Sequence, residues 1–169
     1  MIGRCRRWIP ALAGVFLVGV LLATTAVTAQ TPQRFGDWSL VEFPDQSCRL
    51  VQSVLSRRSG NVLAEVWLGS RVDETAVFSA RVPVGVDLAA GIAYRHPNRS
   101  AAVPLIWQMC GPEKCLAQSQ ITEEETNRLR RGREVVLAFV PIRGSRPLRV
   151  AISLRGVTAG LRAQTTCGD

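Results

Sequence analysis

The sequence predicts a mainly β protein, an antiparallel β-sandwich or barrel-like domain with one short helix, bridged by disulfides. Short apolar runs that alternate with polar residues recur along the chain, and turns rich in Gly, Pro and Asn separate them. The segment 122–132 has both a helix start signal and a helix stop signal. Four of the five cysteines lie beyond an N-terminal export signal, and cysteines of exported proteins are usually paired.

The N-terminus has the pattern of a secretory signal peptide. Arginines within the first eight residues precede an uncharged apolar run over residues 11–27, which ends in small side chains. We expect cleavage after Ala29, which leaves residues 30–169 as a single domain in the periplasm, the outer membrane or the cell surface. The alternative is an uncleaved membrane anchor, because the apolar run is close to the ~17 residues that a spanning helix needs.

The expected mature chain is basic. The full sequence has 21 Lys and Arg against 13 Asp and Glu, and removal of Arg4, Arg6 and Arg7 with the signal leaves 18 against 13, a net charge of +5. This balance favours an anionic envelope or host-surface macromolecule as partner. After cleavage of the signal, we expect only peripheral contact with a membrane. No run of five basic residues and no basic-aromatic stripe supports binding to nucleic acid.

Strands are expected to make up most of the mature domain. The alternation of apolar and polar residues predicts strands at residues 35–43, 48–55, 61–68, 75–82 and 92–95. Turn-forming residues separate them, among them Arg57-Arg58-Ser59-Gly60 and His96-Pro97-Asn98-Arg99. No internal repeat and no low-complexity linker interrupts the series.

A hairpin with two cysteines follows these strands. Residues 104–110 and 115–121 have strand patterns, and the Gly-Pro pair at 111–112 predicts a turn between them. Cys110 and Cys115 would then face each other at a separation that a disulfide tolerates, so we expect a structural bridge. The alternative is a catalytic redox pair, but such pairs usually enclose two residues and this one encloses four.

The predicted helix comes next. Thr122 and Glu125 match a capping box, and an acidic first turn with a basic last turn suits the helix dipole at both ends. Gly132 ends the helix. We expect its charges to form a solvated face, the common role of such runs. Residues 133–142 and 147–154 then predict a final hairpin.

Four cysteines remain after cleavage, and an even number in an exported chain predicts two disulfides. The short hairpin favours Cys110 with Cys115, which leaves Cys48 with Cys167 in a bridge that closes nearly the whole domain. A zinc site with four thiolates is the alternative, but the sequence lacks Cys-x-x-Cys pairs. We therefore expect no metal and no other cofactor.

No motif specifies a reaction. His96 is the only histidine, and the sequence has no Gly-x-Ser-x-Gly elbow, phosphate-binding loop or dinucleotide fingerprint to accompany it. A histidine beside a proline in a turn is expected at the surface. Trp38, Trp67 and Trp107 lie within apolar strands, where we expect core packing rather than a carbohydrate-stacking platform.

Non-catalytic binding to another macromolecule is therefore the favoured function. Two basic turns, one with Arg57 and Arg58 and the other with Arg95 and Arg99, are the candidate patch for an anionic partner. The alternatives are an envelope hydrolase that uses His96 and a thiol-redox helper that uses the cysteines of the central hairpin. A small-ligand binder with a pocket between the sheets is a third interpretation.

Several motifs occur together in a characteristic order. They are Phe35-Gly36-Asp37-Trp38, Cys48-Arg49-Leu50-Val51-Gln52, Cys110-x-x-x-x-Cys115-x-Ala117, Leu129-Arg130-Arg131-Gly132 and Ile152-Ser153-Leu154-Arg155-Gly156-Val157-Thr158-Ala159-Gly160. In this set the mature chain resembles the invasion-associated locus B family of bacterial exported proteins. The resemblance implies an exported or envelope-associated protein without established enzymatic activity, in a family named for a role in host-cell invasion by some pathogens.

The chain departs from the family pattern at one cysteine. Many members resemble a pattern with a cysteine shortly after the Asp-Trp pair, which is bridged near the position of Cys48. Here residues 39–43 contain no cysteine. Cys167 takes the place of that partner, which alters the disulfide pattern that the resemblance implies.

Overall fold

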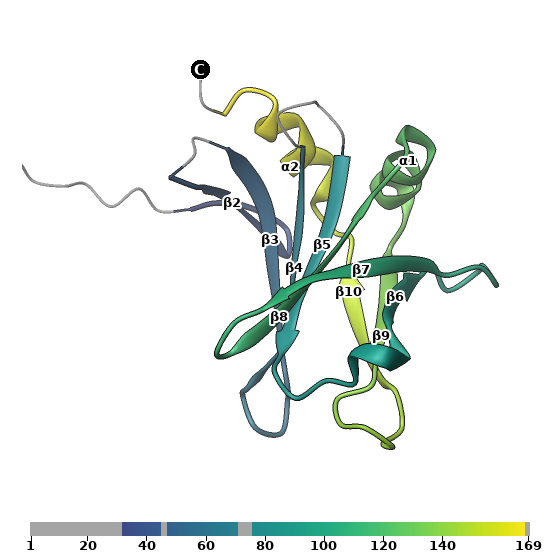
Figure 1. The fold of residues 1–169 in the computed structure, drawn as a ribbon. Coiled ribbons are helices and arrows are strands. Elements are labelled where there is room, and N and C mark those ends of the chain that lie inside the picture. Colours follow the sequence, from purple (N-terminus) through teal and green to yellow (C-terminus); the bar gives the residue numbers. More distant parts are fainter. Residues whose placement is uncertain (1–31, 45–46, 71–75, 168–169) are drawn as a thin grey trace, which may run out of the picture. The chain divides into compact units, whose positions relative to one another are not determined.

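An antiparallel sheet of ten strands forms the body of the protein in the part of the chain that the structure describes (Figure 1). The computed structural model describes residues 32–44, 47–70 and 76–167, so the predicted signal peptide lies outside the described residues. Hydrogen-bonded neighbours follow the order β1-β2-β3-β4-β5-β8-β7-β6-β9-β10. The prediction of a mainly β, antiparallel fold is confirmed.

The bounds of the elements agree with most of the predicted strands. The strands are β1 (Gln33–Phe35), β2 (Trp38–Glu42), β3 (Cys48–Leu55), β4 (Val62–Ser70), β5 (Ala76–Pro83), β6 (Ile92–Arg95), β7 (Val103–Cys110), β8 (Lys114–Gln120), β9 (Glu134–Phe139) and β10 (Leu148–Ser153). The helices are the 3-10 helix η1 (Leu88–Ala90) and the α-helices α1 (Glu123–Arg131) and α2 (Val157–Gln164).

The two ends of the strands differ. Helices α1 and α2 lie at one end, which we call the helix end (Figure 1). At the opposite end the β3–β4 turn (56–61), the β5–β6 connection (84–91) and the β9–β10 turn (140–147) lie together, and we call this the loop end (Figure 1). Strand β6 leads from the loop end toward α1, so the β6–β7 connection (96–102) belongs to the helix end.

Strand β7 joins the two halves of the curled sheet. Its first residues, Val103–Leu105, pair with β6, whereas the rest of the strand pairs with β8. The register shifts between Trp107 and Met109, as at a β-bulge, and bulges bend the strand that contains them. The sheet curls until β10 packs against β3 and β4, which gives the barrel-like form.

The core fills the inside of this curled sheet. Alternate residues of several strands point inward, as in β9, where Val135, Leu137 and Phe139 are buried. Tyr94 and Phe78 are fully buried and stack with their ring centroids 4.2 Å apart. The alternation that predicted the strands is therefore the alternation that separates core from surface.

A buried side chain closes the seam between β10 and the first strands. The amide of Gln52 on β3 donates to the Ser153 carbonyl at 3.1 Å and accepts from the Ser153 amide at 3.0 Å. Trp38 Nε1 donates to the same carbonyl at 2.8 Å. Gln52 therefore supplies hydrogen-bond partners to the amide and carbonyl of Ser153 on the edge of β10 that has no neighbouring strand. Buried backbone groups need such partners.

Two glycines let the backbones approach closely at this seam. The Asp37 amide donates to the Arg155 carbonyl at 3.1 Å. A Cβ atom on Gly156 would lie 1.9 Å from the Phe35 carbonyl oxygen, and one on Gly36 would lie 2.5 Å from the Arg155 carbonyl oxygen. Both glycines also have positive φ angles, +101° and +58°, a region that other residues rarely adopt.

An ion pair covers the seam from outside. Asp37 accepts hydrogen bonds from Arg155 Nη2 and from the Ser153 hydroxyl, each at 2.7 Å. The hydrogen bonds from Arg155 and Ser153 hold the pKa of the Asp37 carboxyl below its ordinary value. Two of the quoted motifs, at 35–38 and 152–160, therefore meet in space and build the closure of the fold.

Two details of the predicted elements are corrected. The structure has a second α-helix, α2, where one helix was predicted, because Gly156 starts it without a side-chain cap and leaves no capping signal in the sequence. The predicted strand 35–43 is split into β1 and β2 by the turn at Gly36, and these two strands pair with each other. Among the described residues no helix is long and apolar enough to cross a bilayer.

Candidate functional site

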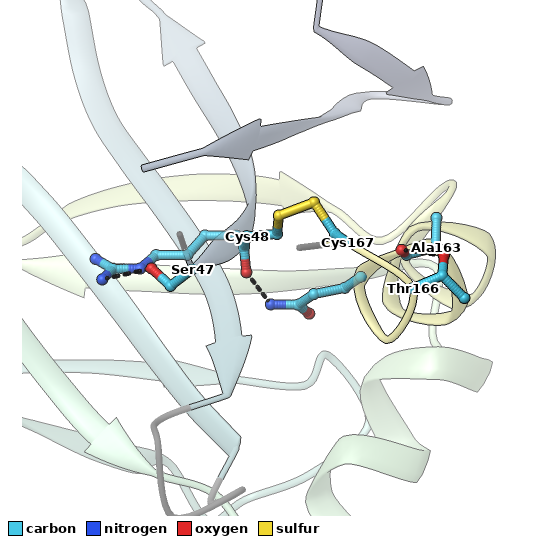
Figure 2. Close-up of a disulfide and its surroundings, with 7 residues drawn as sticks. Ser47, Cys48, Ala163, Thr166 and Cys167 are labelled. Atoms are coloured by element: carbon cyan, nitrogen blue, oxygen red, sulfur yellow. Dashed lines mark hydrogen bonds between the residues drawn. A yellow bond between two sulfur atoms is a disulfide. The ribbon is translucent and has the colours of Figure 1, made fainter. Parts of the chain in front are cut away.

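The two disulfides fix opposite ends of the sheet. Cys48 at the start of β3 is bonded to Cys167 beyond α2, with a Cα separation of 6.1 Å (Figure 2). The Gln164 side chain also donates to the Cys48 carbonyl, so the C-terminal segment is attached to β3 both covalently and by a hydrogen bond. This bridge spans 119 residues of sequence.

The second disulfide lies in the β7–β8 hairpin. Cys110 and Cys115 are opposite each other in the strand register, with a Cα separation of 3.9 Å. The Gly111 amide donates to the Lys114 carbonyl at 2.9 Å and closes the turn. Because the four sulfurs are bonded in two separate pairs, they do not form the tetrahedral set that the zinc interpretation requires.

His96 is not a surface side chain. Only 13% of its side chain is exposed, and its Nε2 lies 2.8 Å from Glu125 Oε1 on α1. The Tyr94 hydroxyl donates to the same oxygen at 3.0 Å, and Arg128 Nη1 donates to the other carboxylate oxygen at 3.0 Å. We call these four side chains the Glu125 network. The expectation of a turn histidine in solvent is wrong because α1 packs over the end of β6.

The charges of the helix also differ from the prediction. Glu125 is buried, with 6% of the residue exposed. The prediction that all charges of the helix face solvent is therefore wrong for this residue. Burial acts to raise the pKa of the Glu125 carboxyl, but hydrogen bonds from His96, Arg128 and Tyr94 outweigh it and lower the pKa below its ordinary value. An ionised carboxylate only accepts hydrogen bonds, so His96 Nε2 carries the proton that it donates.

Tyr94 stays protonated in this network. Burial, followed by the nearby Glu125 carboxylate, raises the pKa of the Tyr94 hydroxyl far above its ordinary value. The hydroxyl can therefore act only as a donor at ordinary pH. No buried polar side-chain atom among the described residues lacks a hydrogen-bond partner, so the network is fully satisfied and positions α1 against β6.

An open depression of about 680 Å³ lies above the Glu125 network. Its walls include His96 and four arginines, Arg99, Arg128, Arg131 and Arg133, and we call it the arginine depression. Glu134 is the one carboxylate among its lining residues. The β6–β7 connection contributes Arg99, while α1 and the residue after Gly132 contribute the others.

The arginines of the depression differ in their partners. Arg128 is held by Glu125 at 3.0 Å and also pairs with Glu124. Within the described ranges, Arg99, Arg131 and Arg133 form no ion pair with a carboxylate. Three guanidinium groups therefore keep their charge available to an external anion.

The structure divides the predicted arginine patch into two sets. Arg57 and Arg58 are exposed in the β3–β4 turn at the loop end. Arg95 and Arg99 are exposed at the end of β6 and in the connection that follows, beside α1 at the helix end. The four side chains do not form one surface, and only Arg99 lines the depression.

The three tryptophans have different environments. Trp38 is fully buried in the core, as expected. Trp107 is partly buried and packs against the core cluster. Trp67 lies instead on the outer face of the sheet, where the Arg81 guanidinium stacks 4.9 Å from its ring centroid. The core prediction is wrong for Trp67 because its neighbours in β4, such as Val66, point inward and alternation turns Trp67 outward.

The Glu125 network has the geometry of a structural cluster more than of a reaction centre. A carboxylate that orients a histidine is part of many hydrolytic sites. In the hydrogen bonds of the described residues, however, His96 contacts Glu125 and no serine, threonine or cysteine side chain. No group of three or more metal-ligating side chains occurs in the part of the chain that the structure describes.

Comparisons with known proteins agree with this fold. A family model described as "Invasion associated locus B (IalB) protein" matches residues 28–165. The crystal structure of invasion associated protein B from Bartonella henselae is similar with a TM-score of 0.71 and 17% sequence identity, over 81% of this chain and 97% of that chain. At that identity the likeness shows the shared fold. No curated protein matches the sequence. Because the family match covers most of the chain, this protein belongs to the invasion associated locus B family.

Proposed function

We propose that this chain is an exported, non-catalytic interaction module that binds an anionic macromolecule of the envelope or of a host surface. Its binding site is the arginine depression at the helix end. Membership of a family associated with invasion supports a role in contact with other surfaces. Export rests on the predicted signal peptide at residues 1–29.

The observation that carries this proposal is the set of three arginines without carboxylate partners, Arg99, Arg131 and Arg133, around one open depression. Each guanidinium group presents several donors in a fork that matches carboxylate, sulfate or phosphate oxygens. The Glu125 network holds the elements that carry them, so little ordering is needed when a ligand binds.

The depression suits a polymer better than a small molecule. It is open and has charged walls, whereas sites for small ligands are usually concave, enclosed and mostly apolar. A polymer with repeated anionic groups can contact all three arginines at once, which raises the total affinity beyond that of a single contact.

Retention on an immobilised sulfated polysaccharide tests the proposal. The exported chain is compared with a triple variant, Arg99→Gln, Arg131→Gln and Arg133→Gln, and affinity should fall at least ~10-fold, the change that ~1.4 kcal/mol produces. The matched control is Arg57→Gln, Arg58→Gln and Arg143→Gln at the loop end, which removes the same charge. Equal losses in both triple variants would show a net-charge effect and overturn the assignment of the site.

A hydrolase that uses His96 is the second candidate, because the structure pairs this histidine with Glu125 at 2.8 Å. The variant His96→Gln keeps a polar side chain and tests it directly. Turnover of ester or peptide probes by the wild type that disappears in this variant would establish an enzyme. Absence of turnover in both proteins is the result that the binding proposal predicts.

A further inference from the structure

The loop end carries an unusual share of the exposed apolar side chains. Among the described residues six large apolar side chains are exposed, and four of them lie here: Leu55 at 53%, Val84 at 44%, Leu88 at 48% and Ile142 at 68%. Single exposed apolar residues are normal, but several at one end of a molecule indicate a contact surface. These four come from three separate segments of the chain.

The turns that present these residues are well formed. In the β9–β10 turn the Ser145 amide donates to the Ile142 carbonyl at 2.9 Å. The Asp87 amide donates to the Val140 carbonyl at 2.9 Å and joins the β5–β6 connection to that turn. Leu88 lies in η1, and its backbone carbonyl accepts a hydrogen bond from Trp107 Nε1 at 3.2 Å. The apolar tips therefore stand on a fixed frame rather than on loose chain.

Arginines surround the apolar tips. The β3–β4 turn has Arg57 and Arg58, and the β9–β10 turn has Arg143 and Arg146, all exposed. None of the four forms an ion pair with any carboxylate of the described residues. The acidic residues at this end are Asp87, whose carboxylate accepts from the Ala89 amide, and Glu113. The loop end is therefore net positive.

We propose that the loop end docks on an anionic phospholipid leaflet of an envelope membrane. Apolar side chains at the tips of turns can enter the boundary between headgroups and acyl chains, while arginines remain at the level of the phosphates. Anionic lipid attracts each basic residue near the surface.

The loop end lies at the opposite end of the strands from α1 (Figure 1), and residues of α1 line the arginine depression, so the two sites are separate. A chain that rests on the membrane by its loop end would hold the helix end and its depression away from the bilayer. The two proposals stand on different residues, so one can fail without the other.

Co-sedimentation with vesicles tests the proposal. Vesicles of phosphatidylcholine alone are compared with vesicles that also contain phosphatidylglycerol, with the exported chain and its variants. We expect binding only with phosphatidylglycerol. The variant Arg57→Gln, Arg58→Gln and Arg143→Gln should lose affinity by about fivefold for each arginine, or roughly 100-fold in all. The triple variant of the depression, which changes net charge equally, should bind within about twofold of wild type because its arginines face away.

A second variant separates insertion from charge attraction. Ile142→Ser with Leu88→Ser keeps every charge and should reduce binding to phosphatidylglycerol vesicles at the same low salt concentration at which the wild type binds. All variants share one N-terminus, so any contribution from it cancels in the comparison. Equal binding to both vesicle types, equal losses in the two arginine triples, or no effect of the two serines would each overturn the proposal.

Discussion

The helix end and the loop end of this sheet both carry exposed arginines, but the arginines stand on different kinds of support. At the helix end the chain is held by the Cys48–Cys167 bridge, the Gln52 and Gly156 seam and the buried Glu125 network. At the loop end the support is a set of hydrogen-bonded turns. The Val84 amide donates to the Glu113 carbonyl and joins them to the adjoining β7–β8 hairpin, with its local disulfide across five residues of sequence.

This difference indicates two modes of contact. A depression on fixed elements can hold anionic groups at defined positions, because the backbone that carries its arginines needs little ordering on binding. Apolar tips on separate turns suit a partner that has no fixed shape, such as a lipid surface. We expect the two ends to differ in stability in the same way.

The largest difference should come from the disulfides. Replacement of Cys48 and Cys167 by serine removes a bridge that closes 119 residues, and we expect a loss of about 5 kcal/mol in unfolding free energy by the chain-entropy model. The same change at Cys110 and Cys115 opens a loop of five residues and should cost about 2 kcal/mol. Denaturant unfolding under non-reducing conditions measures both. Equal losses would contradict the contrast between the two ends.

A pair of glycines gives the next contrast. Gly156→Ala at the seam places a Cβ 1.9 Å from the Phe35 carbonyl oxygen, so the seam must open, and we expect a loss of about 4 kcal/mol. Gly144→Ala in the β9–β10 turn has a φ of +80° but meets nothing within 4 Å, and should cost only the backbone strain of about 1 kcal/mol. Thermal melts of the two variants provide the test. Similar midpoints would show that the close approach at the seam does not stabilise the fold more than the β9–β10 turn does.

The Glu125 network gives a smaller effect. Glu125→Gln removes the charged acceptor that Tyr94, His96 and Arg128 share and should destabilise the fold by about 3 kcal/mol. Glu123→Gln, on the exposed face of the same helix, is the matched control and should change stability by less than ~0.5 kcal/mol. Urea unfolding at neutral pH compares the two.

The same variant tests the pH dependence. The folded-state pKa of Glu125 is lowered, so its contribution is complete above the ordinary glutamate pKa and is lost as the pH falls through the folded value. Asp37 acts in the same direction because its pKa is also lowered. Wild-type stability should therefore decline in the acid range below the ordinary carboxyl pKa, and Glu125→Gln should show a shallower decline. Parallel curves would show that Glu125 titrates alike in the folded and unfolded chain.

Much of the fold could be predicted because its signals are local. Alternation with a period of two located the strands, and the capping box located α1 within one residue. Strand order could not be read in this way, since the pairing of β5 with β8 and of β6 with β9 joins distant segments. Helix α2 escaped because it begins at Gly156 without a side-chain cap and is stabilised by packing against Leu50 and its neighbours.

The candidate site was less accessible to sequence reasoning. His96 and Glu125 lie 29 positions apart, and only the packing of α1 over β6 brings them together. One signal was present, because Glu125 and the apolar Leu129 are four residues apart and share a helix face. That spacing predicts a glutamate directed at the core, which requires a buried partner. The motifs at residues 35–38 and 152–160 were visible in the sequence. That they close the fold could not be predicted, because this role depends on the contact between two segments far apart in the chain.

Hydrogen-exchange mass spectrometry of this protein with each probe tests most directly whether the two ends bind two different partners. With the sulfated polysaccharide we expect protection of residues 96–99 and 128–134 and no change in the loop-end turns. With vesicles that contain phosphatidylglycerol we expect protection of residues 56–61 and 140–147 and no change at the helix end. Protection of the same segments by both probes would contradict the assignment of two ends to two partners.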